Sequence, residues 1–272
     1  MTLRRLALAA TLTLTVAMGV LACGDEDLEP ANEIVIDVPW TAPESYEYIL
    51  MDDDGQEQGS GSLSVIEQAG RFAIIQDFDD EDGNSDRSVL LVDAETLEPL
   101  AGAREIVDAE DDRRVLLDTQ YSELSDGSYG VRIRERNFDP ATEEDPESER
   151  CNPLKLPENA YDNDSSLFLW RTIQFEEDHD VIYTASIPNR RLRRDVTLSV
   201  IRQERVETPA GSFDAWYMAI LAEGQSHEAW FATTDDHKLL KYDNDNVIFL
   251  YTGDAQSPPQ FEEPRGVSEE CD

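Results

Sequence analysis

The chain has 272 residues, of which 40% are hydrophobic and 30% are charged, and 60 acidic against 22 basic residues give it a formal net charge of −38. This hydrophobic share is enough to form a core, which excludes a wholly disordered chain, and the length suits one large all-β domain or two small domains. The acidity excludes nucleic acid as a partner and disfavours loose docking on anionic lipid headgroups, because both need clustered basic residues.

The first 22 residues predict a signal for export. Arg4 and Arg5 precede residues 6–22, a run of apolar, small or threonine residues that is slightly short for a membrane-spanning helix. Cys23 follows Val-Leu-Ala, which resembles the lipobox of bacterial lipoproteins. The resemblance implies that Cys23 becomes the acylated N-terminus of the mature protein, and two or more acyl chains anchor a protein stably in a membrane. The alternative is an ordinary cleaved signal in which Cys23 stands by chance.

Residues 23–33 are acidic, contain Pro30 and predict a tether between the lipid and a folded domain. In residues 34–252, short β-branched or aromatic runs alternate with Gly, Asp, Asn and Pro, which is the pattern of strands and turns. The short connections favour antiparallel hairpins, so we predict a single, meandering antiparallel sheet. The expected strands are 34–38, 45–51, 62–68, 71–78, 88–92, 104–108, 113–121, 129–136, 180–187, 196–207, 214–222, 227–232, 238–242 and 247–251.

One short helix is expected at residues 165–173, where Asp164 or Ser165 is a suitable N-cap. A short amphipathic helix suits the task of covering the mouth of a curved sheet. A further strand is the alternative, because Phe, Trp and Ile also favour strands. The residues that form one apolar stripe at helical spacing are Leu167, Trp170 and Ile173.

Two proline-rich segments, 137–164 and 253–272, are expected to be an irregular surface insertion and an acidic tail. Each contains one cysteine, Cys151 and Cys271, and an exported compartment favours a disulfide between them. Such a bond closes a loop of roughly 120 residues and stabilises the fold by about 4–5 kcal/mol through loop-closure entropy. Two free thiols are the alternative. Zinc does not suit these cysteines, because neither has a second cysteine or a histidine pair nearby.

Residues 215–221 are apolar on both faces of the expected strand, so a helix, the curvature of the sheet or a ligand must cover the second face. Aromatic residues concentrate in the C-terminal half of the chain. Core packing explains them, and the alternative is a concave, apolar pocket of the kind that holds an acyl chain. The candidate ligand-binding residues are Trp170, Trp216, Met218, Trp230 and Phe249.

The sequence does not contain a recognisable set of catalytic residues. The only histidines are His179, His227 and His237. His227-Glu228 begins like a zinc-protease helix, but the second histidine is missing and the surrounding sequence favours a strand. No serine has the G-x-S-x-G context, and no glycine-rich phosphate loop opens a helix. We therefore predict no cofactor and no catalysis, with a hydrolase whose triad comes from distant residues as an alternative.

Acidic residues cluster at three expected hairpin turns, 52–55, 77–83 and 243–246. Solvated turns explain these clusters, and weak cation binding is the alternative, since Ca²⁺ requires oxygen ligands. The EF-hand pattern fails at the first two, because Leu50 and Phe78 stand where its first aspartate belongs. We predict no dedicated metal site.

Three sequence segments resemble the domain of unknown function 3108 family of exported bacterial proteins. They are Val-Glu-Thr-Pro-Ala-Gly-Ser-Phe-Asp-Ala-Trp at 206–216, Glu-Ala-Trp-Phe-Ala-Thr at 228–233 and Lys-Leu-Leu-Lys-Tyr at 238–242. The resemblance covers roughly residues 46–252. It implies a large curved antiparallel sheet, similar to lipoprotein-carrier (Lol-type) and sigma-factor-regulator folds. Together with the helix expected at 165–173, we predict an open or half barrel with one short helix covering it. Those relatives cradle lipid or acyl groups on the concave face, and the family has no assigned catalytic residues.

These features together predict a non-enzymatic cell-envelope protein that is anchored to a membrane by a lipid on Cys23. We expect it on the outer face of the cytoplasmic membrane or in the outer membrane, and Gly24 does not indicate which. Its curved sheet is expected to bind an apolar small molecule or an envelope protein. The alternatives are a structural or interaction module with weak cation binding at the acidic turns, and an unrecognised hydrolase.

Overall fold

The computed structural model describes residues 31–271. The predicted signal, the proposed acylation site Cys23 and most of the predicted tether lie outside the described residues. Within them, no helix is long and apolar enough to cross a bilayer.

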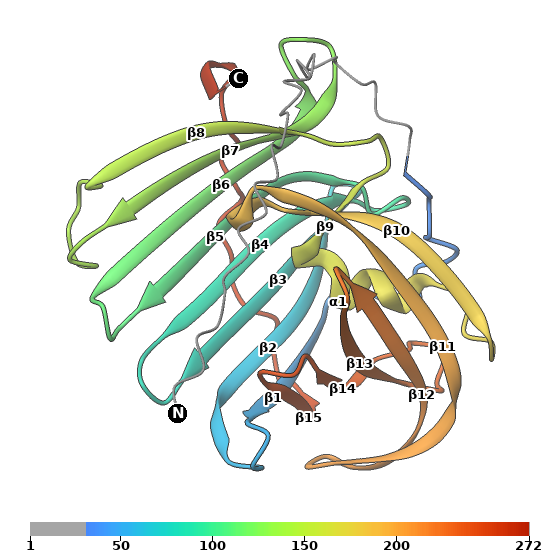
Figure 1. Cartoon of the computed structure of the whole chain (residues 1–272). Helices are drawn as coiled ribbons and strands as arrows, with labels where there is room; N and C mark the ends of the chain where they lie inside the picture. The colour runs from blue at the N-terminus through green and yellow to red at the C-terminus, as the bar shows by residue number, and fades with distance from the viewer. Residues whose placement is uncertain (1–30, 272) are drawn as a thin grey trace, which may run out of the picture.

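The described chain forms a single sheet of 15 strands around one short helical segment (Figure 1). The order across the sheet is β8-β7-β6-β5-β4-β3-β2-β1-β15-β14-β13-β12-β11-β10-β9, and the pairing is antiparallel except between β9 and β10. The prediction of a mostly β protein with a large curved antiparallel sheet is confirmed. The strands are β1 Glu44–Met51, β2 Glu57–Gln68, β3 Arg71–Asp80, β4 Ser85–Asp93, β5 Pro99–Asp108, β6 Arg113–Glu123, β7 Tyr129–Phe138, β8 Ser148–Lys155, β9 Tyr161–Asp162, β10 His179–Ile187, β11 Leu192–Thr208, β12 Gly211–Ala222, β13 Gln225–Ala232, β14 Leu239–Asp243 and β15 Ile248–Asp254.

The sheet has two arms that meet where β1 pairs with β15. The N-terminal arm is β1 to β8 and the C-terminal arm is β9 to β15, and within each arm successive strands are neighbours. Short connections explain this for the antiparallel pairs, whereas the parallel pair β9 and β10 is joined through the helical segment. Five residues, 156–160, carry the chain from β8 at one edge of the sheet to β9 at the other. The sheet therefore curls until its two edges approach, although no strand pairing between β8 and β9 closes it into a barrel.

Side chains, rather than backbone hydrogen bonds, bridge the two arms along this seam. The Tyr121 hydroxyl on β6 lies 2.7 Å from the Ser186 hydroxyl on β10. Arg191, just before β11, forms an ion pair of 2.5 Å with Glu135 on β7. Arg193 donates to the carbonyl of Lys155 at 2.9 Å. The seam is thus polar and mostly made of side-chain contacts.

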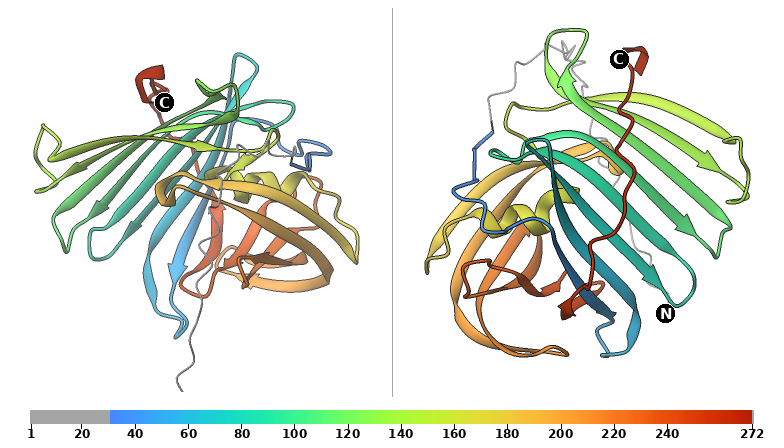
Figure 2. Two further views of the ribbon diagram at one scale, coloured as in Figure 1. Left: turned by 45° about the horizontal axis from the view of Figure 1, so that its top comes forward. Right: turned by 180° about the vertical axis from the view of Figure 1, so that it is seen from behind.

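The predicted helix is present, and the alternative of a strand at these residues is wrong. It consists of η1 Asn163–Ser165, α1 Ser166–Leu169 and η2 Trp170–Thr172. The Asp162 carboxylate caps its start by accepting a hydrogen bond from the backbone N–H of Asp164 at 2.8 Å. All residues from 165 to 172 are buried, because the segment lies on the concave side of the sheet between the two arms (Figures 1 and 2).

Two expectations about local structure are wrong. Residues 34–38 are not a strand, and the amide of Ile36 bonds to the carbonyl of Thr172 in the helical segment instead of to the sheet. Residues 137–164 are not irregular throughout, because they contain β8 and β9. Strand β8 is polar and contains Pro153, which is tolerated because β8 is an edge strand and does not need all its N–H groups for pairing.

The C-terminal tail, residues 255–271, runs across the outer face of the N-terminal arm (Figure 2). Arg71 on β3 pairs with Glu263 at 3.0 Å, and Arg87 on β4 donates to the carbonyl of Gln260 at 2.8 Å. At its end, Cys271 is bonded to Cys151 on β8, with 4.8 Å between their Cα atoms. The tail therefore covers the convex side of the arm and is joined covalently to the edge of the sheet.

Candidate functional site

The concave side of the sheet contains a cleft with a free volume of about 260 Å³, which we call the interior cleft. The N-terminal arm, the helical segment and the C-terminal arm all contribute to it, since the sheet curls around the helix. The residues that matter most below are Phe78, Trp170, Tyr183, Arg194, Tyr242 and Phe249. The cleft is therefore formed by tertiary structure and not by one local motif.

Aromatic rings form one wall of the interior cleft. The indole N–H of Trp170 donates to the Tyr183 hydroxyl at 2.8 Å, and the Trp170 ring lies 5.7 Å from that of Tyr242. Phe249 packs against Tyr242 at 5.5 Å and edge-on against Phe78 at 5.2 Å. Such contacts stabilise aromatic pairs beyond their buried area. The wall is thus held in place by its own packing and offers a rigid, largely apolar surface.

Two arginines line the interior cleft, and their surroundings differ. Arg104 on β5 is neutralised by Asp86, at 2.5 Å, and by Asp164, at 2.9 Å. Arg194 on β11 donates to the side-chain oxygen of Asn163 at 3.2 Å, and its Nε has no hydrogen-bond partner. Within residues 31–271, no carboxylate lies within ion-pairing distance of Arg194. One guanidinium of the cleft is therefore fixed by the protein, while the other remains available.

His227 on β13 also lines the cleft, and its ring stacks on Tyr242 with centroids 6.1 Å apart. Its Nδ1 is buried and has no hydrogen-bond partner. Burial lowers the pKa of His227, and the positive charge of Arg194 lowers that pKa further, while the smaller effects of Asp245 and Asp243 oppose the shift. The imidazole is therefore neutral at neutral pH and presents an unused polar nitrogen beside Arg194.

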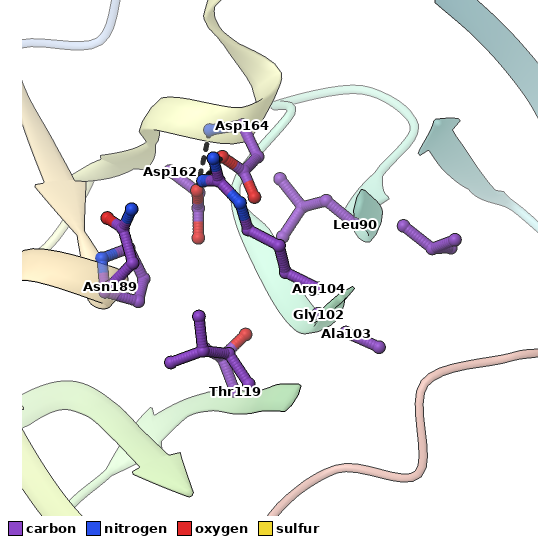
Figure 3. Close-up of a pocket in the computed structure, with 11 residues that line it drawn as sticks. Leu90, Gly102, Ala103, Arg104, Thr119, Asp162, Asp164 and Asn189 are labelled. Atoms are coloured by element: carbon purple, nitrogen blue, oxygen red, sulfur yellow. Dashed lines mark hydrogen bonds and ion pairs between the residues drawn. The ribbon is translucent and has the colours of Figure 1, made fainter. Parts of the chain in front are cut away.

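Arg104 also borders a second, much smaller cavity of about 20 Å³, whose walls include Asp162, Asp164 and Asn189 (Figure 3). This volume is close to the minimum for a single water molecule. Burial raises the pKa of Asp162 to about 7, and the nearby charge of Asp164 adds to the shift. The Tyr121 hydroxyl donates a short hydrogen bond to the Asp162 carboxylate. This cavity is too small to admit a substrate, and the cluster around it joins the seam to the start of the helix.

The predicted ligand-binding residues do not gather at one place. Trp170 and Phe249 line the interior cleft together. Met218 is fully buried, and Trp216 packs on Phe175 with 6.3 Å between ring centroids. Trp230 lies on the face of the sheet that points away from the interior cleft. There its indole N–H donates to Glu204 at 2.7 Å, and its ring lines a separate surface groove.

The doubly apolar segment of β12 is covered differently on its two faces. Met218 and Ile220 face the helix side and are buried. On the other face, Tyr217 packs against Trp230 at 5.2 Å where the long β11–β12 hairpin curves over β14 and β15. Leu221, further along the same face, is 50% exposed. The helix and the curvature of the sheet thus cover most of this segment.

Sequence reasoning missed the polar half of the interior cleft, including Arg194 and His227. The sequence does indicate that Arg194 points inward. Arg194, Val196 and Leu198 are every second residue of β11 and so share one face, and the two apolar residues are buried. An arginine in register with core residues indicates a charge that points inward. Whether a carboxylate pairs with that charge depends on the residues that other elements place beside it, and the local sequence does not specify these.

No metal centre is evident in the described part of the chain, where no group of three or more His, Cys, Asp or Glu side chains is arranged to hold an ion. At the acidic hairpin turns, the carboxylates accept hydrogen bonds from the turns themselves. Asp52 accepts from the amide of Gln56 at 2.8 Å, and Asp80 accepts from the amide of Asn84 at 2.9 Å. Turn formation therefore explains why aspartate occurs at these positions.

The fold and the cleft define a protein with an open, strongly curved antiparallel sheet that wraps around a short helix and an internal cleft. The family model described as "Protein of unknown function (DUF3108)" matches residues 51–244, which is most of the chain. The chain belongs to this family. No curated protein matches it.

Three solved structures are similar to the chain at low identity. A β-barrel-like protein of domain of unknown function DUF1849 from Brucella abortus is 13% identical, with a TM-score of 0.46 over 77% of this chain and 95% of that one. A protein from Parabacteroides distasonis, provisionally described as a lipoprotein, is 11% identical, with a TM-score of 0.29 over 82% and 100% of the two chains. A protein with a YmcC-like fold from Bacteroides fragilis is 10% identical, with a TM-score of 0.28 over 83% and 100%.

Proposed function

We propose that this protein is a non-catalytic, lipid-anchored protein of the cell envelope that holds a small, partly apolar molecule in the interior cleft. The observation that carries the proposal is the cleft itself, about 260 Å³ of free volume beside an aromatic wall. Packed protein interiors rarely contain voids much larger than a water molecule. Other hollows of this structure are larger, at about 400 to 590 Å³, but this space lies between the helical segment and both arms, where side chains would otherwise pack. Its position, rather than its size alone, favours a ligand.

The volume limits the size of the ligand. Ligand-binding pockets commonly measure about 300–1,000 Å³, so this cleft lies just below the lower end of that range. At roughly 30 Å³ per water, the cleft has room for about nine water molecules, or for a single acyl chain of about eight carbons. One eight-carbon chain suits this space, whereas a lipid with two or three acyl chains does not.

The arrangement of nucleophiles and bases supports a non-catalytic role. Among the described residues, none of the three histidines forms a hydrogen bond with a serine or cysteine side chain, as a nucleophile–base pair requires. His237, for example, lies against Phe175 at 4.2 Å and contacts the carbonyl of Ala232. The buried hydroxyl of Ser186 is bonded to Tyr121 in the enclosed seam.

The anchoring part of the proposal is based on the sequence before residue 31. A lipid on Cys23, after removal of the preceding residues, tethers the sheet to the outer face of the cytoplasmic membrane or to the outer membrane. The disulfide between Cys151 and Cys271 supports an oxidising compartment outside the cytoplasm. Membrane fractionation, together with mass spectrometry of the mature N-terminus, tests this part, and an unmodified Cys23 in a soluble fraction contradicts it.

Calorimetric titration of the purified mature protein with octan-1-ol tests the binding part. Burial of seven methylenes at about 0.8 kcal/mol each gives a dissociation constant on the order of 0.1 mM. Ala222 lines the cleft and points toward its free volume, so Ala222→Phe fills the cleft and is expected to abolish binding. Ala219→Phe is the matched control, because Ala219 lies on the opposite face of the same strand. Equal binding by both variants contradicts the proposal.

A further inference from the structure

We propose that the molecule held in the interior cleft is a single-chain amphiphile with an anionic head group, a carboxylate or a phosphate monoester, and that Arg194 and His227 bind the head. This inference rests on the proposed function and narrows its ligand class. It changes the sequence-based expectation of a purely apolar ligand, because about half of the side chains that line the cleft are polar or charged.

The first support is the ion-pairing of the buried and half-buried arginines on the concave side. Arg104 is paired with Asp86, Arg171 with Glu44 and Arg191 with Glu135. Arg194 does not have a carboxylate partner within residues 31–271. In a chain with 60 acidic and 22 basic residues, a half-buried arginine without an acid is unexpected on composition alone. Its position therefore suggests that its counter-ion comes from outside the chain.

The second support is that two polar groups of side chains that line the cleft lack partners. The Nε of Arg194 and the Nδ1 of His227 are both buried without a hydrogen-bond partner. Asn163, at the start of the helical segment, holds one terminal nitrogen of Arg194 at 3.2 Å and so orients the guanidinium. Buried polar groups that lack partners destabilise a protein. An anionic head group with two or more oxygens, bound at this part of the cleft, offers an acceptor to each of the two groups.

The chemistry of the two side chains favours an anion over a neutral ligand. A guanidinium presents its N–H groups as a planar fork, which matches the paired oxygens of a carboxylate or phosphate. A neutral imidazole contributes one further N–H donor. The lowered pKa of His227, caused by burial and then by Arg194, is consistent with their closeness in the cleft.

The aromatic wall next to these groups determines where the rest of the ligand lies. Tyr242 contacts both the His227 ring and Phe249, and so joins the polar side chains of the cleft to the apolar surface. An acyl chain whose head is at Arg194 therefore extends along Tyr242 toward Phe249 and Phe78. Asp86 faces the same cleft, but both its oxygens are engaged by Arg104, so it does not compete for Arg194.

Calorimetric titration of the mature protein with four eight-carbon probes and with inorganic phosphate tests the inference. The probes are octanoate, octyl phosphate, octan-1-ol and octyltrimethylammonium. We expect octanoate or octyl phosphate to bind at least tenfold more tightly than octan-1-ol, and the ammonium probe to bind most weakly. The tighter of the two anions identifies the head group. Inorganic phosphate is expected to bind at least tenfold more weakly than octyl phosphate.

Variants assign the effect to particular residues. Arg194→Gln removes the charge and is expected to weaken binding of the anionic probes by about 10- to 100-fold, the usual effect of one charge-assisted hydrogen bond, while octan-1-ol changes less than twofold. Arg205→Gln is the matched control, because Arg205 lies on the same strand with its side chain 65% exposed. His227→Gln gives a second, independent loss. Near-ultraviolet circular dichroism shows whether each variant keeps the native packing.

The outcomes separate this inference from the proposed function. If octanoate, octyl phosphate and octan-1-ol bind the native protein equally and Arg194→Gln changes nothing, the anionic head group is refuted while the proposed function stands. If none of the chain-bearing probes binds, the proposed function fails and this inference fails with it. If inorganic phosphate binds as tightly as octyl phosphate, the cleft is an anion site that does not hold a chain, and the amphiphile is refuted.

Discussion

Replacement of the buried Asp162 is expected to change how stability depends on pH. The carboxyl group is enclosed by Tyr121, Ser186 and the start of the helical segment, and burial raises its pKa from 3.8 to about 7, with Asp164 adding to the shift. An acid whose pKa is higher in the folded state binds a proton more readily when the protein is folded. Stability therefore decreases as pH rises from about 4 to about 7, and levels off above that pH.

The size of the effect follows from the shift. About three pKa units at roughly 1.4 kcal/mol each correspond to about 4 kcal/mol of unfolding free energy between pH 4 and pH 7. Asp162→Asn cannot ionise, so the variant lacks this contribution but keeps that of Asp164, whose pKa burial also raises. The wild type is thus expected to gain about 4 kcal/mol relative to the variant when the pH is lowered from 8 to 4.

Urea unfolding followed by tryptophan fluorescence between pH 4 and pH 8 measures this difference. Comparison with the variant is essential, because the repulsion among 60 acidic residues also changes with pH. Asp235→Asn, at an exposed position, is the matched control and is expected to follow the wild type in parallel. A constant difference between wild type and Asp162→Asn across this pH range refutes the reasoning, since it shows that Asp162 does not gain a proton there.

Three further predictions concern stability. Cys271→Ser opens a loop with a sequence separation of 120 residues and is expected to cost about 4–5 kcal/mol in urea unfolding; a wild type that is unaffected by reducing agent contradicts this. Phe168→Ala removes a fully buried ring of the helical segment and is expected to cost about 3–5 kcal/mol, measured in the same way, and a loss below 1 kcal/mol means that the helix is not part of the core. Arg171→Met leaves the half-buried Glu44 without its ion pair, so we expect a loss of about 3 kcal/mol, and an unchanged melting temperature excludes that role.

The strands of the sheet are predictable because their signals are local. Alternation of apolar and polar side chains at 129–136 predicts β7, which the structure extends from Tyr129 to Phe138. The turn before it contains Gly127 with a positive φ of 83°, a conformation that glycine adopts without strain. Where burial, alternation and turn chemistry agree, the local sequence is sufficient to predict a strand.

Strand β8 could not be predicted in this way, because an edge strand buries little. Its sequence, Ser-Glu-Arg-Cys-Asn-Pro-Leu-Lys, is polar and resembles a loop. What makes it a strand is the free edge of β7, where residues 130–137 pair with it. This information comes from the neighbouring strand and not from the segment itself.

The interior cleft was only half predictable, and the two tryptophans of the β12–β13 hairpin explain why. Trp216 pairs with Phe231, and Tyr217 pairs with Trp230, so Trp216 and Trp230 lie on opposite faces of the sheet. A shift of the register by one residue would exchange their faces. Residue type therefore identifies aromatic side chains that are suitable for a pocket, but the register decides which of them reach it.

The availability of Arg194 depends on a continuous polar network that begins at the seam. Asp162 accepts from Tyr121 across the seam and caps the helical segment at Asp164, and Asp164 in turn binds Arg104. At the cleft end of this network, the carboxylate of Asp164 thus pairs with Arg104, which lies on the N-terminal arm. Arg194 lies on the opposite arm, where the same helical start offers it the neutral Asn163. The side-chain contacts that hold the two arms together and the charge left available in the cleft are therefore parts of one arrangement of side chains.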